Sequence, residues 1–360
     1  MPMHNRRFRP CPGRPLTRLA PMRVGMLTGG GDCPGLNPVI RAVCRRLWED
    51  GHETFGVLNG WRGMIDGNLK PLGWDEISGI LPKGGTIIGT SRTNVYKNEG
   101  GVEAVKTTFE QLDALVAIGG EDTLGVAARL FAEEGLPVVG VPKTIDNDLN
   151  GTDYTFGFDT AVAVATDAVD RCHSTAESHN RAIVIETMGR HAGWIALFTG
   201  IAGGADYILI PEQPVDYDEV AAAVERRRAR DKNFSVIVAS EGAELPGFAD
   251  EGEIDEFGHV RVENRAVGET VAQEVEKRTG MQTRATVLGY IQRGGSPTPR
   301  DRMLGLRFGL KAADLVRAGT WGEMAALHGD DVVSVPLTEA TAELKLVPAE
   351  WYETAKTFFG

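Results

Sequence analysis

Short apolar runs alternate with amphipathic stretches along this chain from Arg23 onward. Residues 24–27, 115–118 and 138–141 have the length and the β-branched composition of buried strands, and glycine-rich or polar turns follow them. Stretches of helical period, such as residues 159–174, separate such runs. Strands that alternate with helices predict an α/β fold of mostly parallel sheets with crossover helices.

The first predicted helix begins at about Pro38. Val39, Ile40, Val43, Leu47 and Trp48 then share one face, and Asn37 is the expected N-cap. A second series of elements follows the same logic: strands at 181–187, 207–210, 235–240 and 285–288, and helices at 216–230 and 262–279.

Polar residues collect where the predicted strands end. The loops concerned are 29–37, 119–123 and 142–148. Ligands of open parallel sheets bind beyond the carboxyl ends of the strands, so these loops are the candidate site. The alternative is that each turn only connects a strand to a helix, which is harder to accept for three turns rich in acids and hydroxyls.

Glycines 29–31 precede a predicted helix and can present N–H groups to an anion. The loop is neither a Walker A sequence nor a dinucleotide fingerprint, because the lysine of the first and the downstream acid of the second are missing. In loop 119–123, Glu121 is a candidate magnesium ligand. Glu121 and Asp122 could instead only complement a helix dipole.

The run Thr144-Ile145-Asp146-Asn147-Asp148 carries the strongest signal. If the segment is extended, Thr144, Asp146 and Asp148 point the same way, which places a hydroxyl and two carboxylates together. One carboxylate can then accept a proton from a substrate hydroxyl. An Asx-turn without catalytic meaning is the alternative.

Several arginines near strand ends indicate more than one phosphate group, because arginine binds phosphate with two parallel hydrogen bonds. They are Arg92, Arg181, Arg190, Arg284 and Arg293. His191 follows Arg190 and is interpreted as a packing or hydrogen-bonding residue rather than a catalyst.

The composition of the chain argues against several kinds of partner and location. The chain has 360 residues, 42% of them hydrophobic, and a formal net charge of −12, which argues against nucleic acid or an anionic membrane as a partner. There is no apolar run of membrane-spanning length and no signal-peptide pattern in residues 1–21, a segment interpreted as a disordered or misassigned tail. The four cysteines show no metal or disulfide spacing, and the cytoplasm is the expected compartment.

Six segments, in order, make the chain similar to the 6-phosphofructokinase family from about Met22 to Thr320. They are residues 27–37, 119–123, 142–148, 188–190, 240–242 and 288–295. The resemblance implies two Rossmann-like three-layer α/β/α domains with mostly parallel sheets. It also implies phosphoryl transfer to the C1 hydroxyl of fructose 6-phosphate, with Mg2+ as cofactor.

The resemblance assigns roles residue by residue. Asp146 is the expected base, Lys143, Arg92 and Arg190 are expected to act in transfer, and Glu121 is expected to bind the metal. Donor binding falls to Gly30, Gly31, Asp122, Thr123 and Lys143. Substrate binding falls to Thr144, Asp146, Asp148, Arg181, Met188, Gly189, Arg190, Glu241, Arg284, Tyr290 and Arg293. Arg181 and Arg284 resemble arginines that reach into a neighbouring subunit's site, so a homo-oligomer, dimer or tetramer, with shared active sites is expected.

Departures from the family pattern concern the phosphoryl donor. ATP-using members usually carry glycine at the positions of Asp122 and Lys143. The residues found here resemble the branch that uses pyrophosphate, because an acid at 122 repels the α-phosphate of ATP and a lysine at 143 attracts pyrophosphate. Trp61 lies where an adenine-stacking aromatic often occurs, which favours some nucleotide access. Glu121 stands where aspartate is usual, and Tyr290 replaces a histidine.

The expected donor-binding domain comprises residues 22–159 plus about 281–322. The expected sugar-phosphate domain comprises about 160–280 plus 323–344, and 345–360 form a C-terminal tail.

Three other functions are alternatives: an ATP-dependent 6-phosphofructokinase with atypical loops, a non-catalytic ligand-sensing subunit of the same fold, and a lipid or NAD kinase. The last leaves the Thr144–Asp148 run unexplained.

Overall fold

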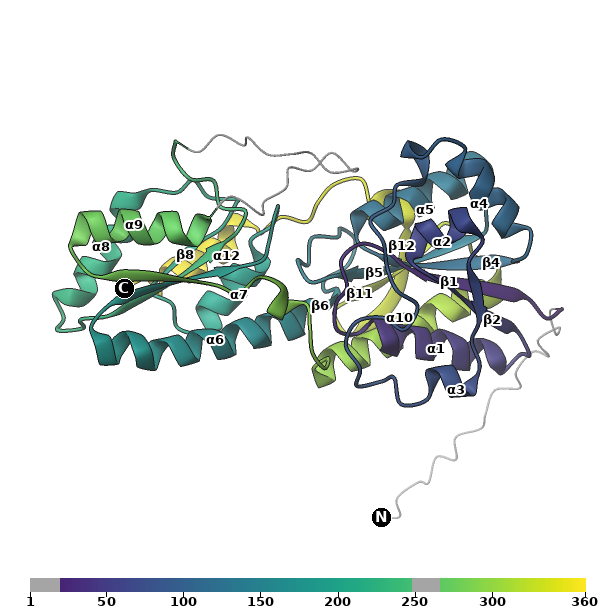
Figure 1. Ribbon diagram of the computed structural model, residues 1–360, viewed down its shortest axis with the longest axis horizontal. Coiled ribbons are helices and arrows are strands. Elements are labelled where there is room, and N and C mark those ends of the chain that lie inside the picture. Colours follow the sequence, from purple (N-terminus) through teal and green to yellow (C-terminus); the bar gives the residue numbers. More distant parts are fainter. Residues whose placement is uncertain (1–19, 248–265) are drawn as a thin grey trace, which may run out of the picture.

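Two lobes, each built around one β-sheet, make up this computed structural model (Figure 1). The structure describes residues 20–247 and 266–360. Most of the expected tail at 1–21 and the start of the helix expected at 262–279 lie outside the described residues.

Within residues 20–247 and 266–360, the first sheet has eight strands, in the order β12-β11-β5-β4-β1-β2-β3, with β6 paired to β5. Its inner strands run parallel, whereas β3 and β12 are antiparallel to their neighbours at the two edges. The bounds are β1 (Arg23–Thr28), β2 (Glu53–Val57), β3 (Leu69–Pro71), β4 (Ala114–Gly119), β5 (Val138–Thr144), β6 (Phe156–Gly157), β11 (Glu323–His328) and β12 (Asp331–Pro336).

Helices cover both faces of the first sheet. Because both faces are buried, β4 is apolar throughout: Val116 and Ile118 join one core cluster, and Leu115 and Ala117 join the other. The elements of this lobe are α1 (Leu36–Trp48), α2 (Gly60–Asp66), α3 (Trp74–Ile77), η1 (Val95–Lys97), α4 (Gly101–Phe109), α5 (Glu121–Glu134), α10 (Pro299–Ala318) and α11 (Leu337–Ala340).

Helices α1 and α10 pack closely because α10 carries glycine at the contact. A Cβ atom at Gly309 would come within 2.7 Å of the Cβ of Ala42, and one at Gly305 within 3.0 Å of the Gly35 oxygen. Any larger residue at these positions would push the two helices apart.

The described part of the second sheet has four parallel strands in the order β10-β7-β9-β8. Its lobe comprises α6 (Phe158–His179), β7 (Ala182–Thr187), α7 (Trp194–Ala202), β8 (Tyr207–Leu209), α8 (Tyr217–Arg228), β9 (Ser235–Ser240), α9 (Val267–Thr279), β10 (Thr283–Val287), η3 (Gly289–Gln292) and α12 (Ala349–Lys356). None of the helices in the described part of the chain has the length and apolarity needed to cross a membrane.

The start of α1 differs from the prediction. Gly35, with a φ of 114°, is the N-cap, and Asn37 lies inside the helix. The Asn37 side chain instead donates to the oxygens of Lys83 and Gly84 and accepts from the N–H of Ile87. Its role is therefore to hold the loop that leads to Arg92.

Strand membership corrects the expected domain boundaries. β11 and β12 were assigned with residues 323–344 to the second domain, but β11 pairs with β5 and extends the first sheet. β10 was assigned to the first domain, but it pairs with β7 in the second sheet. Residues 345–360, expected to be a tail, include α12, where the Tyr352 hydroxyl donates to the Ile208 oxygen of the second lobe.

A buried hydrogen-bond cluster joins the N-terminal ends of α6 and α10, and therefore the two lobes. The carboxylate of Asp301, fully buried on α10, accepts from both the N–H and the hydroxyl of Thr160 on α6, at 2.8 and 2.5 Å. In return, the Thr298 hydroxyl donates to the Asp159 carboxylate at 2.6 Å. Burial raises the pKa of Asp301 to about 6.

We expect Asp301→Ala to lower the free energy of unfolding by about 1–3 kcal/mol, because it leaves the buried N–H of Thr160 without its acceptor. Urea denaturation would measure this. Asp167→Ala, at an exposed ion pair on α6, the helix that carries Thr160, is the control and should have little effect.

Asp301→Asn should also remove a pH dependence. The pKa of Asp301 is higher in the folded state than its unfolded value of about 3.9, so ionisation of this group costs stability as pH rises from about 4 to about 6. The stability of the wild type relative to Asp301→Asn should fall over that window. A constant difference would contradict the assignment.

Candidate active site

A cavity of about 660 Å³ lies between the lobes, at the carboxyl ends of both sheets. Parallel pairing of β1, β4 and β5 brings the loops after these strands to one edge, and β7, β9 and β10 do the same in the second lobe. Fifteen of the expected site residues line the cavity: Gly30, Gly31, Arg92, Glu121, Asp122, Thr123, Lys143, Thr144, Asp146, Asp148, Met188, Arg190, Glu241, Tyr290 and Arg293.

The glycine loop after β1 is bonded to the loop that carries Arg92. The N–H of Gly30 donates to the Ser91 oxygen at 2.9 Å, and the Thr90 hydroxyl donates to the Gly30 oxygen at 2.6 Å. The N–H of Gly30 is thus engaged within the protein, contrary to the expectation that it faces a phosphate. A Cβ atom at Gly31 would come within 2.5 Å of the Arg293 guanidinium, so this glycine makes room for that cation.

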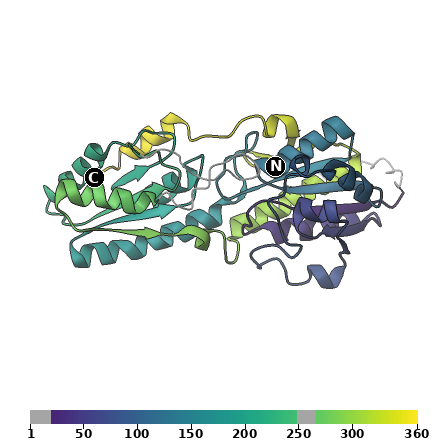
Figure 2. The ribbon, with the colours of Figure 1, turned by 45° about the horizontal axis from the view of Figure 1, so that its top comes forward.

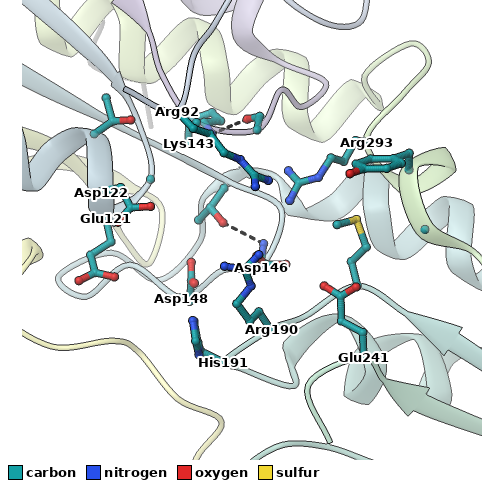
Figure 3. Close-up of a pocket in the computed structure, with 18 of the residues that line it drawn as sticks. Arg92, Glu121, Asp122, Lys143, Asp146, Asp148, Arg190, His191, Glu241 and Arg293 are labelled. Atoms are coloured by element: carbon teal, nitrogen blue, oxygen red, sulfur yellow. Dashed lines mark hydrogen bonds between the residues drawn. The ribbon is translucent and has the colours of Figure 1, made fainter. Parts of the chain in front are cut away.

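Lys143 is 3% exposed, and its Nζ donates to the Gly31 oxygen at 2.6 Å. Burial lowers the pKa of this ammonium group. A Cβ atom at Gly30 would come within 3.4 Å of the Nζ, so the lysine lies directly against the glycine loop. Arg92, Lys143 and Arg293 together lie on one side of the cavity in Figure 3.

Asp146 and Asp148 reach the cavity through a turn and not through an extended strand, which corrects the predicted alternation. β5 ends at Thr144, whose hydroxyl accepts the N–H of Asp146 at 3.0 Å, and Asn147 has a φ of 53°. Burial, and then the charge of Asp146, raise the pKa of Asp148 to about 7. The Oδ1 atom of Asp146 is buried and accepts no hydrogen bond from the described residues.

Glu121 and Asp122 form the first turn of α5 and line the cavity from the side opposite Glu241 (Figure 3). Trp61 lies behind this turn. Its ring is 1% exposed and its Nε1 donates to the Thr123 oxygen at 3.2 Å. The expectation that Trp61 offers a stacking surface to adenine is therefore wrong, because both ring faces are covered by protein.

The second lobe contributes a carboxylate and an arginine. Burial, and then the charge of Asp146, raise the pKa of Glu241 to about 7. Its neighbour Gly189, which does not line the cavity, has a φ of 131° and accepts the Ser240 hydroxyl at 2.5 Å. Asp146 and Asp148 lie between Glu241 and Arg190 of the second lobe and the cations Arg92 and Lys143 of the first lobe (Figure 3).

Arg181 and Arg284 do not line the cavity of their own chain. Arg284 lies on the edge strand β10, where its side chain is 53% exposed and bonds to the Thr283 oxygen and the Glu276 carboxylate. Arg181 immediately precedes β7, next to β10 in the sheet. Their expected role in a neighbouring subunit's site stays a prediction.

Other residues that line the cavity were missed from sequence. They are Ser91, Glu186, Ala266, Glu269 and Val287, together with Gly120 and Gly289, which lie in predicted segments but were given no role, and His191, which was expected to pack or to form hydrogen bonds. Glu186 had a signal that could have revealed it, since it is a carboxylate within an otherwise apolar strand. It is buried, its carboxylate accepts the N–H of Gly268 at 2.6 Å, and burial raises its pKa.

Comparison with known proteins shows the family of this chain. The phosphofructokinase family matches residues 23–316. A pyrophosphate--fructose 6-phosphate 1-phosphotransferase of Amycolatopsis mediterranei is 57% identical, over 94% of this chain and all of the relative. An ATP-dependent 6-phosphofructokinase of Mycobacterium tuberculosis is 51% identical, over 94% and 100%. The structure of Pichia pastoris phosphofructokinase superposes with a TM-score of 0.79 at 31% identity, covering 96% of this chain and 40% of the other. This chain belongs to the phosphofructokinase family.

Proposed function

We propose that this protein transfers a phosphoryl group from pyrophosphate to the C1 hydroxyl of fructose 6-phosphate. The products are fructose 1,6-bisphosphate and phosphate. The observation that carries the proposal is the contact of the buried Lys143 ammonium with the Gly31 oxygen, which gives the phosphate loop a fixed cation. The names of relatives that are 49–58% identical over nearly the whole chain support it.

Asp146 serves as the general base. It accepts the proton of the sugar hydroxyl as that oxygen attacks the nearer phosphorus of pyrophosphate, and the bond from this phosphorus to the bridging oxygen breaks in line. The buried Oδ1 of Asp146, which accepts no hydrogen bond from the described residues, supports this role. Lys143, Arg92 and Arg190 neutralise charge on the transferred and leaving groups. Exchange of an anhydride for an ester with modest driving force makes the reaction reversible.

Magnesium is the inferred cofactor, with Glu121 as its protein ligand. Magnesium usually takes one or two protein carboxylates and fills its shell with phosphate oxygens and water. Glu121 lines the same cavity as Asp148, and after burial and Asp146 its charge is a further cause of the raised pKa of Asp148. When bound, the metal would neutralise phosphate charge.

The choice of pyrophosphate over ATP depends on Asp122 and Trp61. The carboxylate of Asp122 lines the cavity at the start of α5 and repels an additional phosphate group. The buried indole of Trp61 provides no surface for a base. The ATP-dependent reading is supported only by the names of relatives that are 49–51% identical.

The sugar phosphate binds toward the second lobe. Two polar groups at this end are the Arg190 guanidinium and the Glu241 carboxyl, and the residues assigned to it are Thr144, Asp148, Met188, Gly189, Arg190, Glu241, Tyr290 and Arg293. Arg181 and Arg284 complete the site of a neighbouring subunit. One exposed apolar side chain near β10 that does not line the cavity supports such an assembly: Ile291 is 59% exposed in the single chain.

Two further inferences concern the cellular compartment and the non-catalytic alternative. The described cysteines Cys33, Cys44 and Cys172 are all free thiols, which supports a reducing, cytoplasmic compartment. The presence of Asp146, Asp148 and Arg190 in one cavity argues against a non-catalytic sensing subunit.

Steady-state assays with each donor test the proposed function. We expect turnover with pyrophosphate and little with ATP, and we expect Asp122→Gly to raise kcat/KM for ATP by about tenfold or more, because it removes the repelling charge. Glu133→Ala, at an exposed position of the same helix, should change neither activity. Strong ATP turnover by the wild type with none from pyrophosphate would overturn the donor assignment.

Asp146→Asn should lower kcat by about 10²–10⁴-fold with KM for fructose 6-phosphate nearly unchanged, because the amide keeps the shape but accepts no proton. Initial-rate kinetics at saturating donor would measure this, with isothermal titration of the sugar phosphate as the binding control. A variant that keeps its wild-type kcat would remove Asp146 from the mechanism.

Complementation tests the shared sites. Asp146→Asn and Arg284→Ala chains, mixed in equal amounts, denatured and refolded together, should recover about a quarter of wild-type activity. Half of the oligomers are then hybrids, and one of their two sites has both residues intact. If each site is built from a single chain, the mixture will show only the mean of the two variants.

A further inference from the structure

The chain crosses from the first lobe to the second between α11 and α12 (Figure 2), and Lys345 belongs to this connecting segment. This crossing runs beside the turn that carries Asp146 and Asp148. The backbone N–H of Lys345 donates to the Asp148 oxygen at 2.8 Å, and Leu344 forms an isolated bridge with Leu149.

The ammonium group of Lys345 donates to three acceptors on the segment that follows the turn. Its Nζ lies 3.1 Å from Asn147 Oδ1 and 2.9 Å from each of the oxygens of Thr152 and Asp153. An ammonium group has three N–H donors, so the contacts match its full capacity. The Lys345 side chain thus bonds to both ends of the segment 147–153 and holds them together.

Asn147 connects this contact to the catalytic acids, because it is the residue between Asp146 and Asp148. It is 1% exposed and adopts a φ of 53°, a conformation that costs energy for a residue other than glycine. Its Oδ1 accepts both the Lys345 ammonium and the N–H of Thr155, at 3.1 Å each. The direction of the two acids therefore depends on bonds to the Asn147 side chain.

The same crossing also binds the loop of the second lobe that faces the catalytic turn. The Lys345 oxygen accepts the Trp194 indole N–H at 2.8 Å. Two residues later, the N–H of Val347 donates to the Glu212 carboxylate, which also accepts the N–H of Gly193 at 3.0 Å. Gly193 and Trp194 directly follow the loop that contains Arg190 and His191.

We propose that Lys345 is a positioning residue for phosphoryl transfer, which sets Asp146 against the sugar-binding loop by holding Asn147 and Trp194 from one point of the chain. The inference rests on the proposed function, because it assumes that Asp146 is the base. Its action is indirect: the Lys345 side chain does not line the cavity. Small displacements of a base from its proton cost much in rate and little in substrate affinity.

The test is the kinetics of Lys345→Met, which keeps the length of the side chain and removes its donors. We expect kcat to fall by about tenfold or more, with KM for fructose 6-phosphate within about threefold of the wild type. Lys345→Arg, which restores a cation with several donors, should recover part of the loss. Lys356→Met is the matched control, because Lys356 is an exposed lysine of the adjoining helix, where it pairs with Glu353 and lies over the Tyr352 ring, and kcat of this variant should be unchanged.

A second variant tests the route through Asn147. Asn147→Gly removes the side chain, and glycine adopts the positive φ without strain. We expect it to lower kcat as much as Lys345→Met does, and the double variant to be no slower than either single variant, because both changes break one connection. Additive losses, or an unchanged kcat in Asn147→Gly, would overturn the proposal, and this variant decides the question if Lys345→Met does not fold.

The wild type is assayed with both donors in the same series, so that two failures can be told apart. No turnover with either donor would contradict the proposed function. Wild-type turnover that Lys345→Met leaves unchanged, or a loss of thermal stability with kcat intact, would contradict the positioning role alone.

Discussion

The arrangement of the site depends on how one buried charge is accommodated. An ammonium group inside a protein must have hydrogen-bond acceptors, and Lys143 finds one in the Gly31 oxygen. That bond joins the end of β5 to the loop after β1, and the same loop is bonded through Gly30 to the segment that leads to Arg92. Three segments that lie far apart in sequence are thereby held in one geometry before any substrate arrives, which is the condition for electrostatic catalysis without reorganisation.

The acidic side chains of the site lie close to one another and to the charge of Asp146. Asp148 and Glu241 both have a raised pKa because each is buried near the charge of Asp146. Acids crowded in this way favour ligands that bring cations or hydroxyl donors, and the cations of the first lobe favour ligands that bring phosphate. The cavity is therefore complementary to a pair of molecules rather than to one: an anion at the glycine loop and a polyhydroxyl compound at the second lobe.

Most residues that line the cavity could be predicted from the sequence because they lie at strand ends, and strand ends are recognised from apolar runs and the turns that follow them. It failed where long-range contacts decide. The pairing of β11 with β5 joins Met324 to Gly140, and no local pattern reveals such a partner. Asparagine is a common helix cap, but the Asn37 side chain forms its hydrogen bonds with the backbone of the loop at Lys83 and Ile87 instead. Lys345 lies nearly 200 positions from Asn147, and an isolated lysine carries no local signal of its contacts.

The place of β11 and β12 has a consequence for biosynthesis. The first sheet contains strands that begin at Arg23 and end at Pro336, so the ribosome must release nearly the whole chain before this sheet can close. Until residues 323–328 emerge, the side of β5 that pairs with β11 lacks that neighbour and is open to incorrect pairing. Folding that waits for such distant segments is slow and exposes intermediates. The nascent chain should therefore need protection from aggregation until its last forty residues are made.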